Sequence, residues 1–162
     1  LDAHADLRES YNGEKFSHAS AIKRCLDYKN VSIISFGVRN ISESEIPVLK
    51  KNKSRINIFW AKDKLKWDLK KFTKMIKNKT VYLTFDVDGL DSGIMPATGT
   101  PEPGGLLWDE TLNIIKIAAK NSNIVGADIN ELSPIKGFNS YNFLVAKLAY
   151  KILSYIFKFK RL

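Results

Sequence analysis

Hydrophobic residues in this chain fall into short runs that alternate with longer segments of helical periodicity. The runs are rich in β-branched and aromatic residues, which is typical of buried strands. They occupy residues 31–36, 56–60, 80–86 and 124–130. The first residues of the chain also resemble the end of a strand, so we expect strands at regular intervals along the whole sequence.

Segments with helical periodicity separate these runs. We expect a short helix that begins near Ser42 and longer helices over residues 17–28, 64–77, 105–121 and 141–157. In the helix over 64–77, the expected apolar stripe consists of Leu65, Leu69, Phe72 and Ile76. Strands that alternate with helices predict βαβ units, and hence an α/β fold in three layers, α/β/α, around a mainly parallel sheet.

The composition is that of an ordinary globular domain of 162 residues, with 44% hydrophobic and 27% charged residues. No apolar stretch reaches the roughly 18 to 20 residues that a membrane span needs, and no signal-peptide pattern is present. We therefore expect a cytoplasmic protein with no membrane partner. The single cysteine, Cys25, cannot form an internal disulfide, and its helical context predicts a buried thiol.

The formal net charge of +9 raises the alternative of a basic nucleic-acid-binding protein. The lysines, however, are spread over the predicted helices and the C-terminal tail, and they do not gather in one motif with interleaved aromatic residues. Solvated helix faces explain such a distribution. We therefore expect no nucleic-acid partner.

Acidic side chains lie at the ends of predicted strands. Asp86 and Asp88 close the third run, and as second neighbours in an extended chain they point the same way. Burying two carboxylates is costly unless a cation balances them. Asp128 and Glu131 lie at the end of the fourth run, and ligands of open parallel sheets bind at the carboxyl ends of strands. One crevice would therefore collect all four groups.

Asp2, His4 and Asp6 open the chain with a polar group at every second position. Three such residues in an extended strand span roughly 13 Å, which is too far for one ion. A strand end that bends into a loop around two ions about 3.5 to 4 Å apart resolves this geometry. Mixed oxygen and nitrogen donors suit manganese better than a structural zinc site. A polar loop with capping aspartates is the alternative.

His18 is one of two histidines in the sequence, and both lie in the first segment beside carboxylates. It stands at the start of the predicted helix over 17–28. This position suits a proton shuttle, and a structural histidine is the alternative.

Five motifs, in order along the chain, resemble those of the ureohydrolases, and most closely those of the agmatinases. They are DAHAD at residues 2–6, SH at 17–18, TFDVDGLD at 84–91, GTPEPGGL at 99–106 and DINELSP at 128–134. The resemblance covers nearly the whole chain. It implies an arginase-like fold and a two-manganese hydrolase that cleaves a guanidino group to urea and an amine.

The resemblance also implies roles for individual residues. The ligands of two Mn²⁺ ions would be Asp2, His4, Asp6, Asp86 and Asp88. His18 would exchange protons with the leaving amine or solvent, and Glu131 would hold the guanidinium through charge-assisted hydrogen bonds. The loop over 99–106, with Thr100, would form one wall of the substrate cleft. A guanidinium carbon is a poor electrophile, and a hydroxide that bridges two metal ions supplies the strong nucleophile it requires.

We expect agmatine as the substrate, hydrolysed to putrescine and urea in polyamine biosynthesis. Residues 7–16 resemble the agmatinase version of this loop and differ from the arginase version. Arginine, guanidinobutyrate or another guanidino compound is the alternative substrate.

One element of the family pattern is missing from the sequence. The family has a further metal-ligand histidine, in a GGDH-type motif upstream of the position of Asp2, and this chain starts after that point. We therefore expect residues 1–162 to be the C-terminal part of a single ureohydrolase domain, without its N-terminal strands. The full-length protein is expected to form homo-oligomers, as relatives usually do. An inactive metal-binding remnant is the alternative.

Overall fold

The structure is a computed structural model that describes residues 1–160. Its strands are β1 (Ile33–Phe36), β2 (Ile56–Phe59), β3 (Thr80–Asp86) and β4 (Asn123–Asn130). Each of the four predicted hydrophobic runs therefore contains a strand, and the ends agree to within two residues. These four predictions are confirmed.

The α-helices of the described chain follow the strands in the expected alternation. They are α1 (Ala21–Cys25), α2 (Ile46–Lys51), α3 (Leu69–Ile76), α4 (Trp108–Asn121) and α5 (Asn139–Phe159). Short 3-10 helices cover His18–Ser20, Glu43–Glu45, Ala61–Lys66 and Val87–Gly89. The last two predicted helices are confirmed, because α4 and α5 lie close to the expected ranges.

The strands pair in two parallel ladders, β1 with β2 and β3 with β4. The parallel orientation predicted from the sequence is therefore confirmed. Within residues 1–160 each ladder is a separate two-stranded sheet, and no described strand pairs with both β1 and β3.

The first two residues join the carboxyl ends of these ladders. The Leu1 ammonium donates to the Thr84 carbonyl at 3.0 Å, and the Leu1 carbonyl accepts from the Asp86 N–H at 2.9 Å. On the other side, the Asp2 N–H donates to the Phe36 carbonyl at 3.0 Å. Alternate residues thus bond to opposite neighbours, as in a strand within a parallel sheet. These bonds follow the ladder pattern, although Leu1 and Asp2 belong to none of the described strands.

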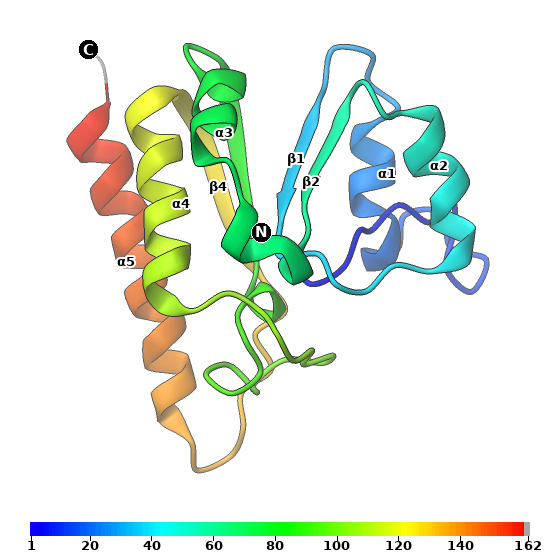
Figure 1. Cartoon of the computed structure of the whole chain (residues 1–162). Coiled ribbons are helices and arrows are strands. Elements are labelled where there is room, and N and C mark those ends of the chain that lie inside the picture. Colours follow the sequence, from blue (N-terminus) through cyan, green and yellow to red (C-terminus); the bar gives the residue numbers. More distant parts are fainter. Residues whose placement is uncertain (161–162) are drawn as a thin grey trace.

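Helices cover the strands from two sides (Figure 1). The helices α3, α4 and α5 lie beside β3 and β4, whereas α1 and α2 lie beyond β1 and β2. The buried apolar residues form two hydrophobic cores, and β1 contributes to both. Ile34 and Phe36 pack into one core, and Ile33 packs into the other. Such alternation is what a strand buried on both faces produces. The order of layers is therefore helix, sheet, helix, as expected.

The predicted helix over residues 64–77 is wrong in its first half. The segment Ala61–Lys66 is a 3-10 helix, and Asp68 then caps α3 by accepting a hydrogen bond from the Lys71 N–H at 2.9 Å. An aspartate in this position favours a new helix start. Leu65, which we had placed on the apolar stripe, is 96% exposed.

The predicted helix over 17–28 is also shorter than expected, because it divides into the 3-10 helix His18–Ser20 and α1. The prediction that Cys25 is buried is wrong, because this thiol is exposed. Ile22 and Leu26, four residues apart, place their shared face against the core, and Cys25 lies off that face.

No helix within residues 1–160 is long and apolar enough to cross a membrane. The longest helix, α5, nevertheless keeps large apolar side chains in solvent. Phe143, Tyr150 and Phe157 are each more than half exposed and stand seven residues apart, which places them on one face of the helix.

Candidate metal centre

One cavity of about 390 Å³ at the carboxyl ends of the strands collects most of the side chains singled out in the sequence. Its lining includes eight of them: Asp2, His4, Asp6, His18, Asp86, Asp88, Thr100 and Glu131. These residues come from the N-terminal segment, the end of β3, the loop over 99–106 and the residues after β4. The fold thus unites segments that are far apart in the sequence.

The strand β3 delivers two of the carboxylates. Asp86 is its last residue, and the Asp86 side chain accepts a hydrogen bond from the Asp88 N–H at 2.9 Å. Asp88 is almost fully buried, and its Oδ1 accepts from the Ala3 N–H at 3.0 Å. The next residue must be Gly89, because a Cβ there would lie 2.9 Å from the Asp2 backbone nitrogen. Close backbone approach therefore brings the N-terminal segment against β3.

Asp2, His4 and Asp88 form a compact group of ligand atoms. Each residue offers one such atom, and these atoms all lie within 4.8 Å of one another. The His4 Nδ1 lies 2.9 Å from Asp88 Oδ2 and 3.8 Å from Asp2 Oδ1. Two carboxylate oxygens and an imidazole nitrogen in this arrangement are suitable donors for a transition-series divalent cation.

Asp6 and Asp86 line the same cavity but lie outside this compact group. The backbone of Asp6 is left-handed, with φ of 52°, so the chain bends sharply there. Glu45 holds this bend from behind, because its buried carboxylate accepts a hydrogen bond from the Leu7 N–H at 2.7 Å. The bend turns Asp6 into the cavity instead of continuing the strand.

The carboxyl groups of the cavity are crowded. Burial, and then the charges of Asp6 and Asp88, raise the pKa of Asp2 to about 7. Burial likewise raises the pKa of Asp6 to about 7, with a contribution from Asp86. For Asp86, burial and then the charge of Asp2 raise the pKa to about 8. A bound divalent cation offsets both desolvation and repulsion, so this donor set fits such an ion.

The His4 and Asp88 side chains are in close contact, with the nitrogen Nδ1 of His4 2.9 Å from Asp88 Oδ2. The hydrogen bond to Asp88 raises the pKa of His4 to about 9. Burial acts to raise the pKa of Asp88, but the hydrogen bonds from His4 and the Ala3 N–H outweigh it and hold that pKa below its usual value. A cation bound by both side chains would displace the proton that His4 carries.

The remaining predicted residues line other parts of the cavity. Thr100 Oγ1 lies 3.5 Å from Asp88 Oδ2, so the loop over 99–106 borders the carboxylate group directly. Glu131 follows β4 with a left-handed backbone, φ 65°, which turns the chain away from the strand direction. The His18 ring meets the Tyr11 ring edge to face at 5.4 Å between centroids.

Asp128 does not line the cavity. Its carboxylate instead accepts a hydrogen bond from Thr84 Oγ1 at 2.7 Å, across the ladder of β3 and β4. The sequence had placed Asp128 in the crevice because it lies near a strand end. Its position within β4 points it across the sheet.

Several lining residues were not predicted from the sequence, namely Arg8, Tyr11, Asn40 and Glu45. For Glu45 a signal was present, since Ser42 and Glu45 have the spacing of a capping box. The Glu45 carboxylate accepts from the Ser42 N–H at 2.7 Å. Its second role, at the bend after Asp6, depends on a contact between distant segments.

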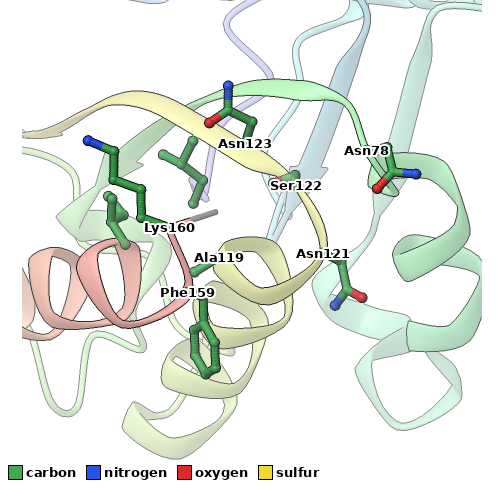
Figure 2. A pocket seen from close by; sticks show the side chains of 9 residues that line it. Asn78, Ala119, Asn121, Ser122, Asn123, Phe159 and Lys160 are labelled. Atoms are coloured by element: carbon green, nitrogen blue, oxygen red, sulfur yellow. The ribbon is translucent and has the colours of Figure 1, made fainter. Parts of the chain in front are cut away.

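A second cavity, of about 290 Å³, lies at the amino ends of β3 and β4, away from the carboxylates (Figure 2). Asn78, Asn121 and Asn123 are among the residues that line it, together with Lys160 near the end of α5. None of the eight predicted residues is among the described residues of its lining. The candidate chemistry therefore belongs to the larger cavity.

Comparison with known proteins points to one family. The family model described as "Arginase family" matches residues 1–154. The chain is 35% identical over 158 residues to the N(1)-aminopropylagmatine ureohydrolase of Synechocystis sp., which covers 96% of this chain and 50% of that protein. It is 37% identical over 136 residues to the agmatinase of Halalkalibacterium halodurans, covering 83% of this chain and 46% of that protein.

A solved structure gives the same result. The agmatine ureohydrolase of Thermoplasma volcanium superposes with a TM-score of 0.83 at 32% identity, over 98% of this chain and 54% of that one. The chain therefore spans about half the length of the relatives that it matches.

Proposed function

Because this chain belongs to the arginase family, we propose that its larger cavity is the active site of a ureohydrolase that converts agmatine to putrescine and urea. The fold is arginase-like, with parallel strands, and represents part of a full-length relative. The observation that carries the proposal is the composition of the cavity. Carboxylates and two histidines from separate segments converge there on one space.

The cavity would hold two manganese ions. In the proposal, their ligands in this chain are Asp2, His4, Asp6, Asp86 and Asp88. The compact group of Asp2, His4 and Asp88 supports this assignment, and so do the raised pKa values of the other two aspartates. Two such cations lower the pKa of a water molecule toward neutrality and so provide a nucleophile for the guanidino carbon.

Glu131 would bind the guanidinium of the substrate. A carboxylate accepts two parallel hydrogen bonds from a guanidinium, which fixes the plane of the group as well as its position. Glu131 lines the cavity and comes within 3.9 Å of a Cβ built on Gly99, so it borders the loop over 99–106. Thr100 in this loop would contact the substrate from the same side.

His18 would move protons between the cavity and solvent. Cleavage of the carbon–nitrogen bond releases an amine, which leaves readily only when it receives a proton. The imidazole lines the cavity but makes no ion pair among the described residues. It is therefore available to deliver a proton to the leaving nitrogen.

Agmatine is the proposed substrate because relatives named agmatinase and N(1)-aminopropylagmatine ureohydrolase align over most of this chain. Both names describe guanidino substrates. Arginine and guanidinobutyrate, which carry a carboxylate that agmatine lacks, are the alternative substrates.

We also propose that residues 1–162 are the C-terminal part of a single ureohydrolase domain. The position of Leu1 between β1 and β3 supports this, because a strand that led into Leu1 would join the two ladders in one sheet. The exposed apolar side chains of α5 support it as well, since further chain would cover them. The resemblance to ureohydrolases implies in addition that the full-length protein forms homo-oligomers.

Urea release tests the proposed function directly. The protein is purified with manganese, and urea is measured after incubation with agmatine, arginine and guanidinobutyrate. The proposal expects urea from agmatine above the other two. No urea from any of the three with the full-length protein would end the hydrolase assignment, and urea from arginine alone would change the substrate.

A further inference from the structure

Arg39 lies three residues beyond β1 and binds an unusual number of backbone groups. Its guanidinium donates to five carbonyl oxygens: Gly37 at 2.9 Å, Asp88 at 2.8 Å, Leu90 at 3.1 Å, Glu102 at 2.6 Å and Pro103 at 3.0 Å. These carbonyls belong to three segments that are far apart in the sequence. Arg39 is therefore a junction between the end of β1, the turn after β3 and the loop over 99–106.

Two of these segments border the cavity from different sides. Asp88 presents its side chain to His4 and Asp2, and Arg39 holds the carbonyl of the same residue. Thr100 lies two residues before Glu102, whose carbonyl Arg39 also holds. Because the same guanidinium grips both segments, it fixes the distance between the Asp88 carboxylate and Thr100.

The guanidinium itself does not line the cavity, although the next residue, Asn40, does. Any effect of Arg39 on the chemistry must therefore pass through the segments that it holds. Asn40 adds a second tether to the same loop, since its Nδ2 donates to Glu102 Oε1 at 2.6 Å. This tether reaches the loop alone and does not involve the turn that carries Asp88.

We propose that Arg39 is a positioning residue that holds the metal-ligand turn at Asp88 and the loop with Thr100 in a fixed relation. This inference rests on the proposed function, in which Asp88 is a metal ligand and Thr100 contacts the substrate. An arginine is required because its planar fork has five donors in fixed directions, whereas a lysine has three donors on one nitrogen. Lysine at this position would keep the charge and lose the simultaneous grip on both segments.

The chain offers a matched control in Arg55. Its guanidinium likewise donates to backbone carbonyls, those of Val31 at 2.9 Å and Leu26 at 3.1 Å among them. These contacts lie around α1 and the start of β1, and Arg55 does not line the cavity. Replacing Arg55 with lysine therefore disturbs a similar arginine–carbonyl cluster away from Asp88.

The test compares Arg39→Lys and Arg55→Lys with the wild-type protein. Manganese affinity is measured by calorimetric titration, and the melting temperature is measured in the presence of EDTA. KM and kcat are measured with agmatine. We expect both variants to lower the melting temperature. We expect Arg39→Lys alone to weaken manganese binding about 10-fold, in the range typical of groups that orient metal ligands, and to raise KM as well.

Equal manganese affinity in Arg39→Lys and the wild type, within twofold, would overturn the proposal. If Arg39→Lys does not fold, Arg39→Gln replaces it with the same measurements, and loss of folding in both would assign Arg39 to stability alone. The titration needs no turnover. If the full-length protein binds manganese, loses affinity in Arg39→Lys and releases no urea, the proposed function is refuted and the role of Arg39 stays intact.

Discussion

The His4 Nδ1 lies 2.9 Å from Asp88 Oδ2, although the two residues come from the first segment of the chain and from the turn after β3. The contact exists because Leu1 and Asp2 lie between β1 and β3 and bring the following residues to the carboxyl ends of both ladders. The candidate metal centre is thus built across the junction of the two ladders. Predictions for single residues follow from this arrangement.

Asp88→Asn is expected to lower manganese content and urea production together. The amide keeps the shape of the carboxylate but loses its charge and one acceptor oxygen, so metal affinity falls by about 10-fold or more. The measurement is metal content after dialysis, beside the rate of urea release. Asp109→Asn, at an exposed site on α4, is the control and leaves both unchanged. Full metal content in Asp88→Asn would remove Asp88 from the ligand set.

Glu131→Gln is expected to spare the metals and impair the reaction. A hydrogen bond to a charged group contributes about 1.5 to 3 kcal/mol, so kcat/KM for agmatine falls by about 10- to 100-fold. Steady-state kinetics with matched metal analysis measures this. Glu14→Gln, at an exposed position outside the cavity lining, serves as the control. Unchanged kinetics would show that the role of Glu131 is misassigned.

His18→Ala is expected to act on the rate of turnover more than on metal or substrate binding. General acid–base groups contribute about 10²- to 10⁴-fold, so kcat falls within this range while manganese content stays constant. The dependence of kcat on pH is the diagnostic measurement. A pH profile of the same shape as that of the wild type would count against a proton-transfer role.

The metal-free protein is expected to lose stability as the pH rises from about 4 to about 9. Asp2, Asp6 and Asp86 have a higher pKa in the folded chain than in the unfolded chain, so they stabilise the fold at low pH and lose this contribution as the pH passes about 7 to 8. The pKa of His4 is raised to about 9, so its contribution to stability is likewise lost as the pH rises to that value. The pKa of Asp88 is lowered in the folded chain, so its contribution to stability is lost as the pH falls, and only under acid conditions.

Thermal melts in EDTA across this pH range measure the effect, and manganese should restore stability most strongly at the alkaline end. Asp86→Asn removes one of the titrating groups and should flatten the decline. A melting temperature in EDTA that rises from pH 5 to pH 8 would contradict the account.

Strands and motif residues could be predicted from the sequence because their signals are local. The run that forms β3 is rich in β-branched and aromatic residues; Asp86 ends it, and Asp88 comes two residues later. The division of the helix over 64–77 was missed because the apolar spacing of Leu65 continues across a break that the Asp68 cap creates. There, a cap and tertiary packing outweighed periodicity.

The supports of the site could not be predicted, since they depend on contacts between distant segments. Arg39 looks in the sequence like a polar residue after a strand, and nothing local indicates that it reaches the carbonyls of Asp88 and Glu102. Glu45 has the spacing of a capping box with Ser42, and nothing local indicates that it also holds the bend after Asp6. The proposed ligands lie in recognisable sequence motifs, whereas the residues that orient them can be identified only from the folded structure.

We propose that this cavity holds two manganese ions between the N-terminal segment and the end of β3. Diffraction from crystals of the protein grown with manganese chloride, recorded near the manganese absorption edge, tests it most directly. The account predicts two anomalous peaks about 3.5 to 4 Å apart, bordered by His4 and Asp88 and by Asp6 and Asp86. No peak in the cavity, or manganese bound only elsewhere on the chain, would contradict it.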